Sequence, residues 1–295
     1  MSKPPTERAD KHLWSWSLTL EDPKDATEYR LLREQRISRT GGHVHTLCLV
    51  IGIMGLVTNQ FFRDTPRAVQ LACAVGNVVL PAIPAYMSLK RRQEFTQWYD
   101  CIVILNQAAV ALLAVFSVGY LDSMEGQSSR GALNAMFFYS PLAVLFTMTV
   151  VHRTTFRGHF IGQVFVAVVS HGWVYSLRLR QELLQPMDAI GWSLETLFSG
   201  VGLFHLSGDQ LSRSDTPFPP WMVAGFFHFA VGLVIPCVVK YVMECYSLAK
   251  YLTQKYHEDA HRMIWTHFFD GVVFAGFAGM TSMLGGWIVL RGFAI

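Results

Sequence analysis

Histidine is the residue type best able to carry chemistry in this sequence, with 11 copies among 295 residues. An imidazole titrates near neutral pH and is a common metal ligand. His257 and His261 are four residues apart, so a helix would place both rings on one face, as two ligands of one metal ion require. Two ligands do not complete a site, and the intervening Glu258 and Asp259 also fit a solvated, charged turn. The pair is a candidate metal site with this structural alternative.

Three further histidines are candidate ligand-binding residues. His171 lies about two turns before the end of one uncharged segment, His228 lies inside the next, and His205 lies between the two segments. Because consecutive spans are antiparallel, we expect His171 and His228 to approach a similar depth. If the three rings converge, they could bind a ligand, a metal or haem, whereas ordinary hydrogen bonds between helices are the alternative. Five other histidines fit interfacial positions at one side of the protein: His43, His45, His152, His159 and His267.

Asn106 and Gln107 lie near the middle of another uncharged segment. Such side chains either line a polar path for a solute or hydrogen-bond to a neighbouring helix. They are the third group of candidate ligand-binding residues.

The segments that must position these side chains are seven runs without Asp, Glu, Lys or Arg. Only 15% of the chain is charged, against about 25% in soluble domains. Each run has about 20 residues or more, which as a helix covers a hydrocarbon core of about 30 Å. The sequence therefore predicts an all-α integral membrane protein, a bundle of seven transmembrane helices in a lipid bilayer. The runs are 40–62, 68–89, 101–121, 131–152, 158–177, 216–239 and 271–290.

The distribution of Lys and Arg predicts a cytosolic N-terminus. With seven spans, 17 of the 24 basic residues fall on the N-terminal side of the membrane, in agreement with the positive-inside rule. Residues 1–42 are then a cytosolic tail and residues 43–295 the transmembrane bundle. The net charge of +3 does not support a nucleic-acid partner. The sequence identifies neither a cofactor nor a particular cellular membrane.

Residues 181–215 leave an alternative topology open. Their apolar middle resembles an eighth span, but Glu195 lies at its centre. Eight spans would also weaken the charge bias to 15 basic residues against 9. We therefore expect an interfacial or re-entrant helix on the extracytosolic side.

The last apolar run contains the small-residue ladder Gly271, Ala275 and Gly279. Small residues at every fourth position let another helix approach closely. The ladder predicts a contact either inside the bundle or between two copies of the chain, which would form a homo-oligomer.

The stretch Trp16-Ser-Leu-Thr-Leu-Glu-Asp-Pro-Lys-Asp-Ala-Thr-Glu-Tyr-Arg30 precedes a basic helix and the first span. It resembles the N-terminal approach to the multi-helix membrane modules of algal and protist membrane cyclases and sensor kinases. The resemblance covers about thirty residues and implies a signalling or sensory membrane domain. No cyclase or kinase domain follows in this sequence.

A second resemblance is to the class of alkaline ceramidases and progestin/adipoQ receptors, which have seven helices and a cytosolic zinc site. Ser88, Asp100, His257 and His261 can be aligned with the zinc-site pattern of that class. The second-helix histidine of the pattern is missing here, with Arg92 four residues after Ser88.

The sequence thus favours a sensor, receptor-like or scaffold module without its own catalytic domain. A small-solute transporter or channel is the alternative, and a metal-dependent membrane hydrolase is the third hypothesis.

Overall fold

The chain folds into helices throughout the part that the structure describes, which confirms the all-α prediction. The computed structural model describes residues 14–15, 18–58, 71, 74–116, 149, 152, 154–176, 184–200, 218–256 and 258–293. Within these residues the β-type pairing is confined to an isolated bridge between Trp14 and Leu20. The elements are α1 (Pro23–Thr58), the π-helical turn η3 (Val75–Val79), α3 (Leu80–Lys90), α4 (Arg92–Gln97), α5 (Tyr99–Phe116), α8 (Phe156–Ser176), α9 (Leu184–Gly200), α10 (Pro220–Phe229), the π-helical turn η7 (Ala230–Val234), α11 (Ile235–Lys255) and α12 (Glu258–Gly292).

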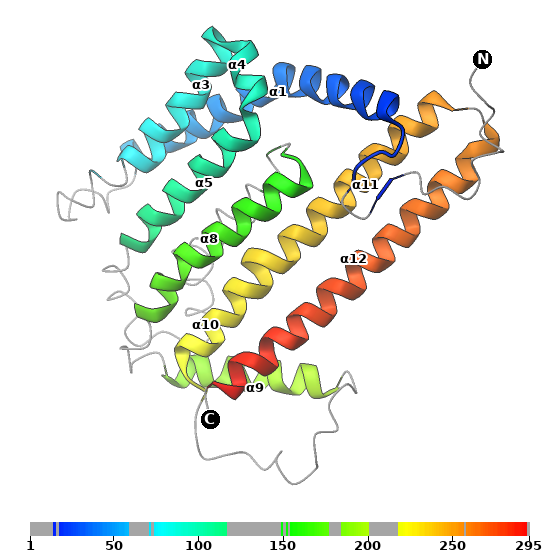
Figure 1. Ribbon diagram of the computed structural model, residues 1–295. Coiled ribbons are helices and arrows are strands. Elements are labelled where there is room, and N and C mark those ends of the chain that lie inside the picture. Colours follow the sequence, from blue (N-terminus) through cyan, green and yellow to red (C-terminus); the bar gives the residue numbers. More distant parts are fainter. Residues whose placement is uncertain are drawn as a thin grey trace.

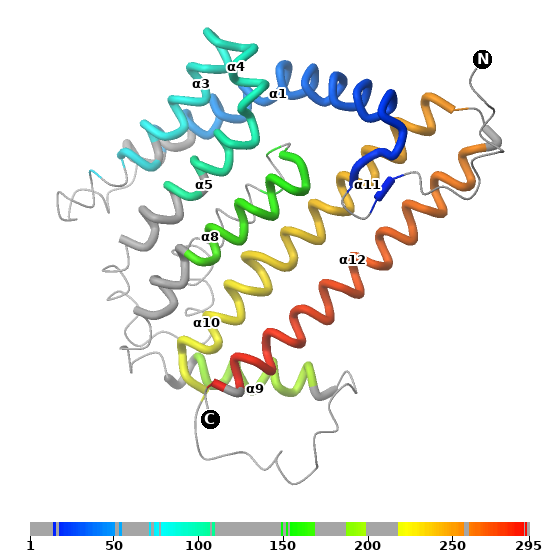
Figure 2. The backbone as a smooth tube through the Cα atoms, in the orientation of Figure 1, coloured from blue at the N-terminus to red at the C-terminus, as the bar shows by residue number. Residues whose placement is uncertain are grey.

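Most of the long helices form a row. Helices α5, α8, α10–α11 and α12 lie side by side in that order, and α3 packs beside α5 (Figure 1). Helix α1 crosses one end of the row, and α9 lies across the opposite end (Figures 1 and 2). The row therefore has an α1 end and an α9 end.

Two helical stretches within the described residues are long and apolar enough to cross a membrane, Pro220–Lys255 with 36 residues and Ala260–Arg291 with 32. Half of the most apolar part of the first stretch is buried inside the protein, whereas only 17% of the most apolar part of the second stretch is buried. This difference follows from the edge position of α12. The expected run 131–152 lies outside the described residues except for Thr149 and His152.

Prolines explain the two π-helical turns. A proline has no N–H, and its ring clashes with the carbonyl four residues earlier. The residues four positions before Pro81 and Pro236 lie in η3 and η7, respectively. A π-helical turn absorbs such a local break without ending the helix.

Helix α1 continues without interruption through Gly41 and Gly42, where the sequence predicted the change from tail to bundle. A Cβ on Gly41 would lie 3.1 Å from the Tyr99 ring, and one on Gly42 would lie 2.6 Å from the Ser88 hydroxyl. The two glycines thus allow α3 and α5 to approach α1 closely.

The small-residue ladder of α12 packs against α11 inside the chain. Gly271, Ala275 and Gly279 are buried, and a Cβ on Gly279 would lie 2.7 Å from Cγ2 of Val238. The ladder is therefore occupied within the chain and is not a free face for a second copy.

Helix α9 is held at its end of the row by polar contacts. The Asp188 carboxylate accepts a hydrogen bond of 2.8 Å from the Phe218 backbone N–H. The buried Glu195 carboxylate accepts one of 2.9 Å from Trp287 Nε1 and forms an ion pair with Arg291 of α12. The acidic residue that made this segment ambiguous in the sequence is thus paired with the last helix.

Candidate functional site

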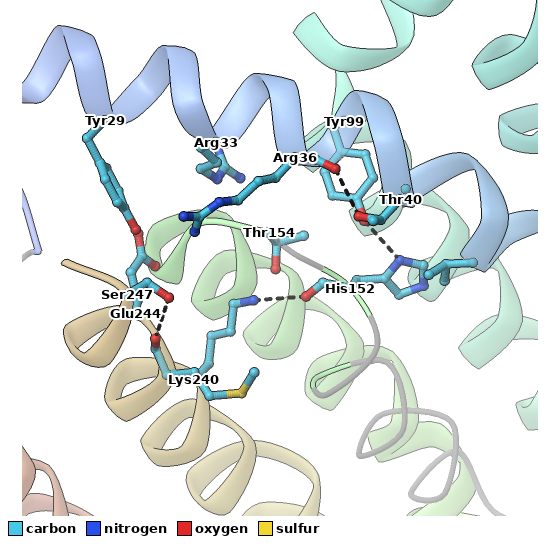
Figure 3. A pocket seen from close by; sticks show the side chains of 13 residues that line it. Tyr29, Arg33, Arg36, Thr40, Tyr99, His152, Thr154, Lys240, Glu244 and Ser247 are labelled. Atoms are coloured by element: carbon cyan, nitrogen blue, oxygen red, sulfur yellow. Dashed lines mark hydrogen bonds between the residues drawn. The ribbon is translucent and has the colours of Figure 1, made fainter. Parts of the chain in front are cut away.

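A cavity of about 420 Å³ lies at the α1 end of the row, where α1 crosses α5, α8 and α11 (Figure 3). Its volume is within the range of small-molecule sites, about 300–1,000 Å³. We call it the α1 cavity. It is lined by Tyr29, Arg33, Arg36, Thr40, Gly41 and Val44 of α1, by Tyr99 of α5, by His152 and Thr154 before α8, and by Lys240, Met243, Glu244 and Ser247 of α11.

Helical periodicity brings these side chains to one place. On α1 the lining residues recur mostly every three or four positions from Tyr29 to Val44, and on α11 they do so from Lys240 to Ser247. Residues at these intervals share one helix face. The two helices turn polar faces toward each other, although about two hundred residues separate them in the chain.

Positive charge dominates the lining. Arg33 forms an ion pair of 2.7 Å with Asp100, and the buried Lys240 ammonium donates a hydrogen bond of 2.9 Å to the His152 carbonyl. The guanidinium of Arg36 extends into the cavity without a hydrogen bond or ion pair to any described residue (Figure 3). Arg36 is therefore available to an anionic ligand.

The other polar groups of the lining are partly used by the fold. The Glu244 carboxylate accepts a hydrogen bond from the Phe156 backbone N–H. The buried Thr154 hydroxyl has no partner among the described residues. Burial raises the pKa of the Tyr29 phenol to about 12, so this side chain is a neutral hydrogen-bonding group at physiological pH. A ligand would thus meet both charged and neutral groups.

A buried polar cluster lies beside the α1 cavity. The rings of His45 and His152 are 4.9 Å apart, and His159 and Gln163 both contact the Thr149 hydroxyl. His45, His152 and His159 are buried inside the protein and do not reach its surface as snorkelling side chains would; their depth relative to a membrane stays a prediction. Neither ring nitrogen of His45 has a hydrogen-bond partner in the described part of the chain. A neutral imidazole buried in this way calls for a partner such as ordered water or ligand, because an unpaired buried donor is costly.

An N-terminal latch, which we define as the contacts of residues 14–28 with α11 and α12, fixes the start of α1. Lys255 forms ion pairs with Asp25, at 2.7 Å, and with Glu28. The hydrogen bond from Lys255 holds the pKa of the Glu28 carboxyl below its ordinary value. Trp14 is buried, and its carbonyl accepts a hydrogen bond of 3.2 Å from His267 Nε2. The latch thus joins the start of α1 to α11.

The candidate ligand-binding residues from the sequence do not line the α1 cavity. Asn106 is buried in α5, and its Oδ1 has no partner among the described residues. His228 is buried in α10, with Nδ1 bonded to the Ala224 carbonyl of its own helix at 2.9 Å. Gln107 and His171 lie in α5 and α8, but their side chains are outside the described residues, as is all of His205. The predicted convergence of the three histidines thus stays a prediction.

The candidate metal ligands are likewise only partly described. His257 lies outside the described residues, and His261 Nε2 bonds the Thr253 carbonyl at 2.9 Å. Of the residues aligned with the zinc-site pattern, Ser88 donates to the Ala85 carbonyl and Asp100 accepts from Arg33. Across the ranges that the structure describes, no three His, Cys, Asp or Glu side chains form a group that could hold a metal ion.

None of the charged residues of the α1 cavity was a candidate from the sequence. Two signals pointed to them. Arginine recurs at every third position from Arg30 to Arg39, and Lys240 and Glu244 form an i, i+4 pair directly after an uncharged run. Comparison of the chain with protein-family models, characterised proteins and solved structures found no match.

Proposed function

We propose that this protein is a multi-pass membrane protein of seven spans that acts as a receptor-like sensor and binds a small anion in the α1 cavity. The observation that carries the proposal is the excess of positive charge in the cavity, above all the Arg36 guanidinium. An arginine presents several N–H donors in a fixed plane, which suits carboxylate and phosphate oxygens.

Exposed apolar side chains support the membrane part of the proposal. Ile161 and Val168 of α8 are 62% and 68% exposed, and Val273 of α12 is 70% exposed. Large apolar residues that recur on the outer faces of long helices need an apolar environment, and the acyl chains of a bilayer supply one. The ion pairs that join α1 to α5 and α11 lie together at the α1 end of the row, as expected at a cytosolic surface.

The way α1 is held supports a sensor. A ligand that bonds both Arg36 of α1 and Lys240 of α11 would connect the same two helices that the latch connects through Lys255. Binding would then stabilise one position of α1, which is how a ligand shifts a conformational equilibrium.

The proposal is tested with purified protein in detergent and three soluble anions: inorganic phosphate, citrate and a nucleoside monophosphate. We expect at least one of them to raise the unfolding temperature of the parent protein, because a ligand of the folded state stabilises it. Arg36→Gln should weaken that binding at least about tenfold, because a hydrogen bond to a charged group contributes about 1.5–3 kcal/mol.

Arg39→Gln is the matched control, because Arg39 is an exposed arginine of the same helix that does not line the cavity. It should leave binding unchanged. If no anion stabilises the parent protein, or if both variants lose binding equally, the assigned role of the cavity is wrong.

A small-solute transporter is the second candidate. It is favoured by the buried Asn106 with its unpartnered Oδ1 and by the π-helical turns η3 and η7, since such turns often occur at functional sites. Uptake of a solute into protein-containing liposomes, abolished by Asn106→Leu, would favour transport over sensing.

A further inference from the structure

A second cleft, of about 880 Å³, lies between α1 and α4 and shares Arg33 and Tyr99 with the α1 cavity. Its lining holds three arginines, Arg30, Arg33 and Arg92, against two carboxylates, those of Glu34 and Asp100, which leaves an excess of positive charge. We call it the α1–α4 cleft. Its volume is larger than that of the α1 cavity.

Two arginines of the α1–α4 cleft have N–H donors that an anion could use. Arg92 donates through Nε and Nη2 to the Ser38 carbonyl, at 3.2 and 2.9 Å, which leaves its Nη1 without a partner among the described residues. The Arg30 side chain is 72% exposed, and its one ion pair with a described residue is a long contact of 3.5 Å with Glu34. Lys90 and Arg91 directly precede Arg92; Arg91 is paired with Glu94 at 3.1 Å, whereas Lys90 adds positive charge next to the cleft.

An apolar strip leaves the cleft along α5. Cys101 lines the cleft and is exposed, and Trp98 and Leu105 lie three residues before it and four after it, on the same face. Trp98 is 56% exposed and Leu105 is 69% exposed. A basic cleft that continues into an exposed apolar strip matches an amphiphile, with an anionic headgroup in the cleft and an acyl chain along α5.

We propose that the α1–α4 cleft binds the headgroup of an anionic phospholipid of the cytosolic leaflet, with an acyl chain on the strip of Trp98, Cys101 and Leu105. An exposed tryptophan directly before an apolar helix is typical of the membrane–water boundary. Basic residues near the membrane surface attract anionic lipid, and each of them raises the affinity by a similar factor, about fivefold. This site depends on the proposed membrane location of the protein, but not on anion binding in the α1 cavity.

The test uses delipidated protein in detergent and three probes: short-chain phosphatidylglycerol, short-chain phosphatidylcholine and inorganic phosphate. Phosphatidylglycerol should bind the parent protein more tightly than either of the others. Arg30→Gln and Arg92→Gln should each weaken it about fivefold, and both together about 25-fold. Leu105→Gln should weaken phosphatidylglycerol but not phosphate, because it changes only the acyl strip.

Arg262→Gln is the matched control, since Arg262 is an exposed arginine of α12 away from the cleft. If Arg92→Gln does not fold, because it loses the bond to Ser38, Arg30→Gln alone decides the test. Equal binding of phosphatidylglycerol and phosphatidylcholine would overturn the proposal. So would phosphate binding as tightly as phosphatidylglycerol, with no effect of Leu105→Gln, because the cleft would then recognise free phosphate. Arg36→Gln should leave lipid binding intact, so that a failure of the α1 cavity and a failure of this cleft can be told apart.

Discussion

A methyl group added at Gly279 tests the packing of α12 on α11. The Cβ of Gly279→Ala would lie 2.7 Å from Val238 Cγ2 and 3.7 Å from Val234 Cγ1. Valine in a helix has one strongly preferred rotamer, so Val238 cannot swing aside and the helices must separate. Gly276→Ala is the matched control, because a Cβ at Gly276 has no neighbouring atom within 4 Å.

The expected magnitude combines two effects. Overpacking a well-packed contact costs about 1–3 kcal/mol. Replacing glycine by alanine inside a helix contributes about 1 kcal/mol in the opposite direction. Gly276→Ala should therefore stabilise the protein by about 1 kcal/mol. Gly279→Ala should be less stable than Gly276→Ala by the overpacking cost of about 1–3 kcal/mol.

The assay is reversible unfolding in mixed micelles with an increasing fraction of denaturing detergent, followed by tryptophan fluorescence. The measured quantity is the difference in unfolding free energy between the two variants. Equal stability of Gly276→Ala and Gly279→Ala would refute the reasoning, because it would mean that the ladder does not hold α12 against α11.

Three further predictions concern the ends of the row. Glu195→Leu should lower the unfolding free energy by about 1–3 kcal/mol, because it leaves the hydrogen-bond donors of Arg291 and the neighbouring tryptophan without their acceptor. Glu195→Gln keeps an acceptor oxygen and should cost less. Unfolding curves of both variants check this. The pKa of the Glu28 carboxyl is lowered in the folded protein. Its ion pair should therefore stabilise the protein fully at a pH above its ordinary pKa of 4.5, and this stabilisation should be lost as the pH falls through the lowered pKa. The stability difference between the parent and Glu28→Gln should accordingly shrink in acid, and an unchanged difference would contradict the latch. Cysteines placed at Lys250 and at the N-terminus should label from the same membrane face and one at Ile295 from the opposite face; labelling of Lys250 and the N-terminus from different faces would indicate an eighth span.

The helices and one of their contacts were predictable because they depend on local pattern. Long uncharged runs predict helices, and small residues at every fourth position predict the close contact that Gly271 and Gly279 make with α11. The choice between an internal contact and a contact with a second copy was not predictable. That choice depends on which helix lies opposite, and spacing within one helix carries no such information.

The candidate site was not predictable to the same extent. Arg36 and Lys240 lie far apart in the sequence, and only the crossing of α1 over α11 brings them to one cavity. His45 was assigned to the membrane surface because of its position at the start of an apolar run. The continuation of α1 through Gly41 and Gly42 instead buries it against His152. Both differences depend on where α1 lies relative to the other helices, and the local pattern of α1 does not contain that information.

The continuity of α1 has a mechanical consequence. With 36 residues at about 1.5 Å each, the helix is a rod of about 54 Å. The rod carries Asp25 and Glu28 of the latch near one end, Arg36 of the cavity farther along, and Gly42 against α3 beyond it. Because a continuous helix resists bending, a shift at the Lys255 end would tilt the whole rod about its close contact at Gly41 and Gly42. A change in the contacts of the latch would therefore also change the width of the α1 cavity.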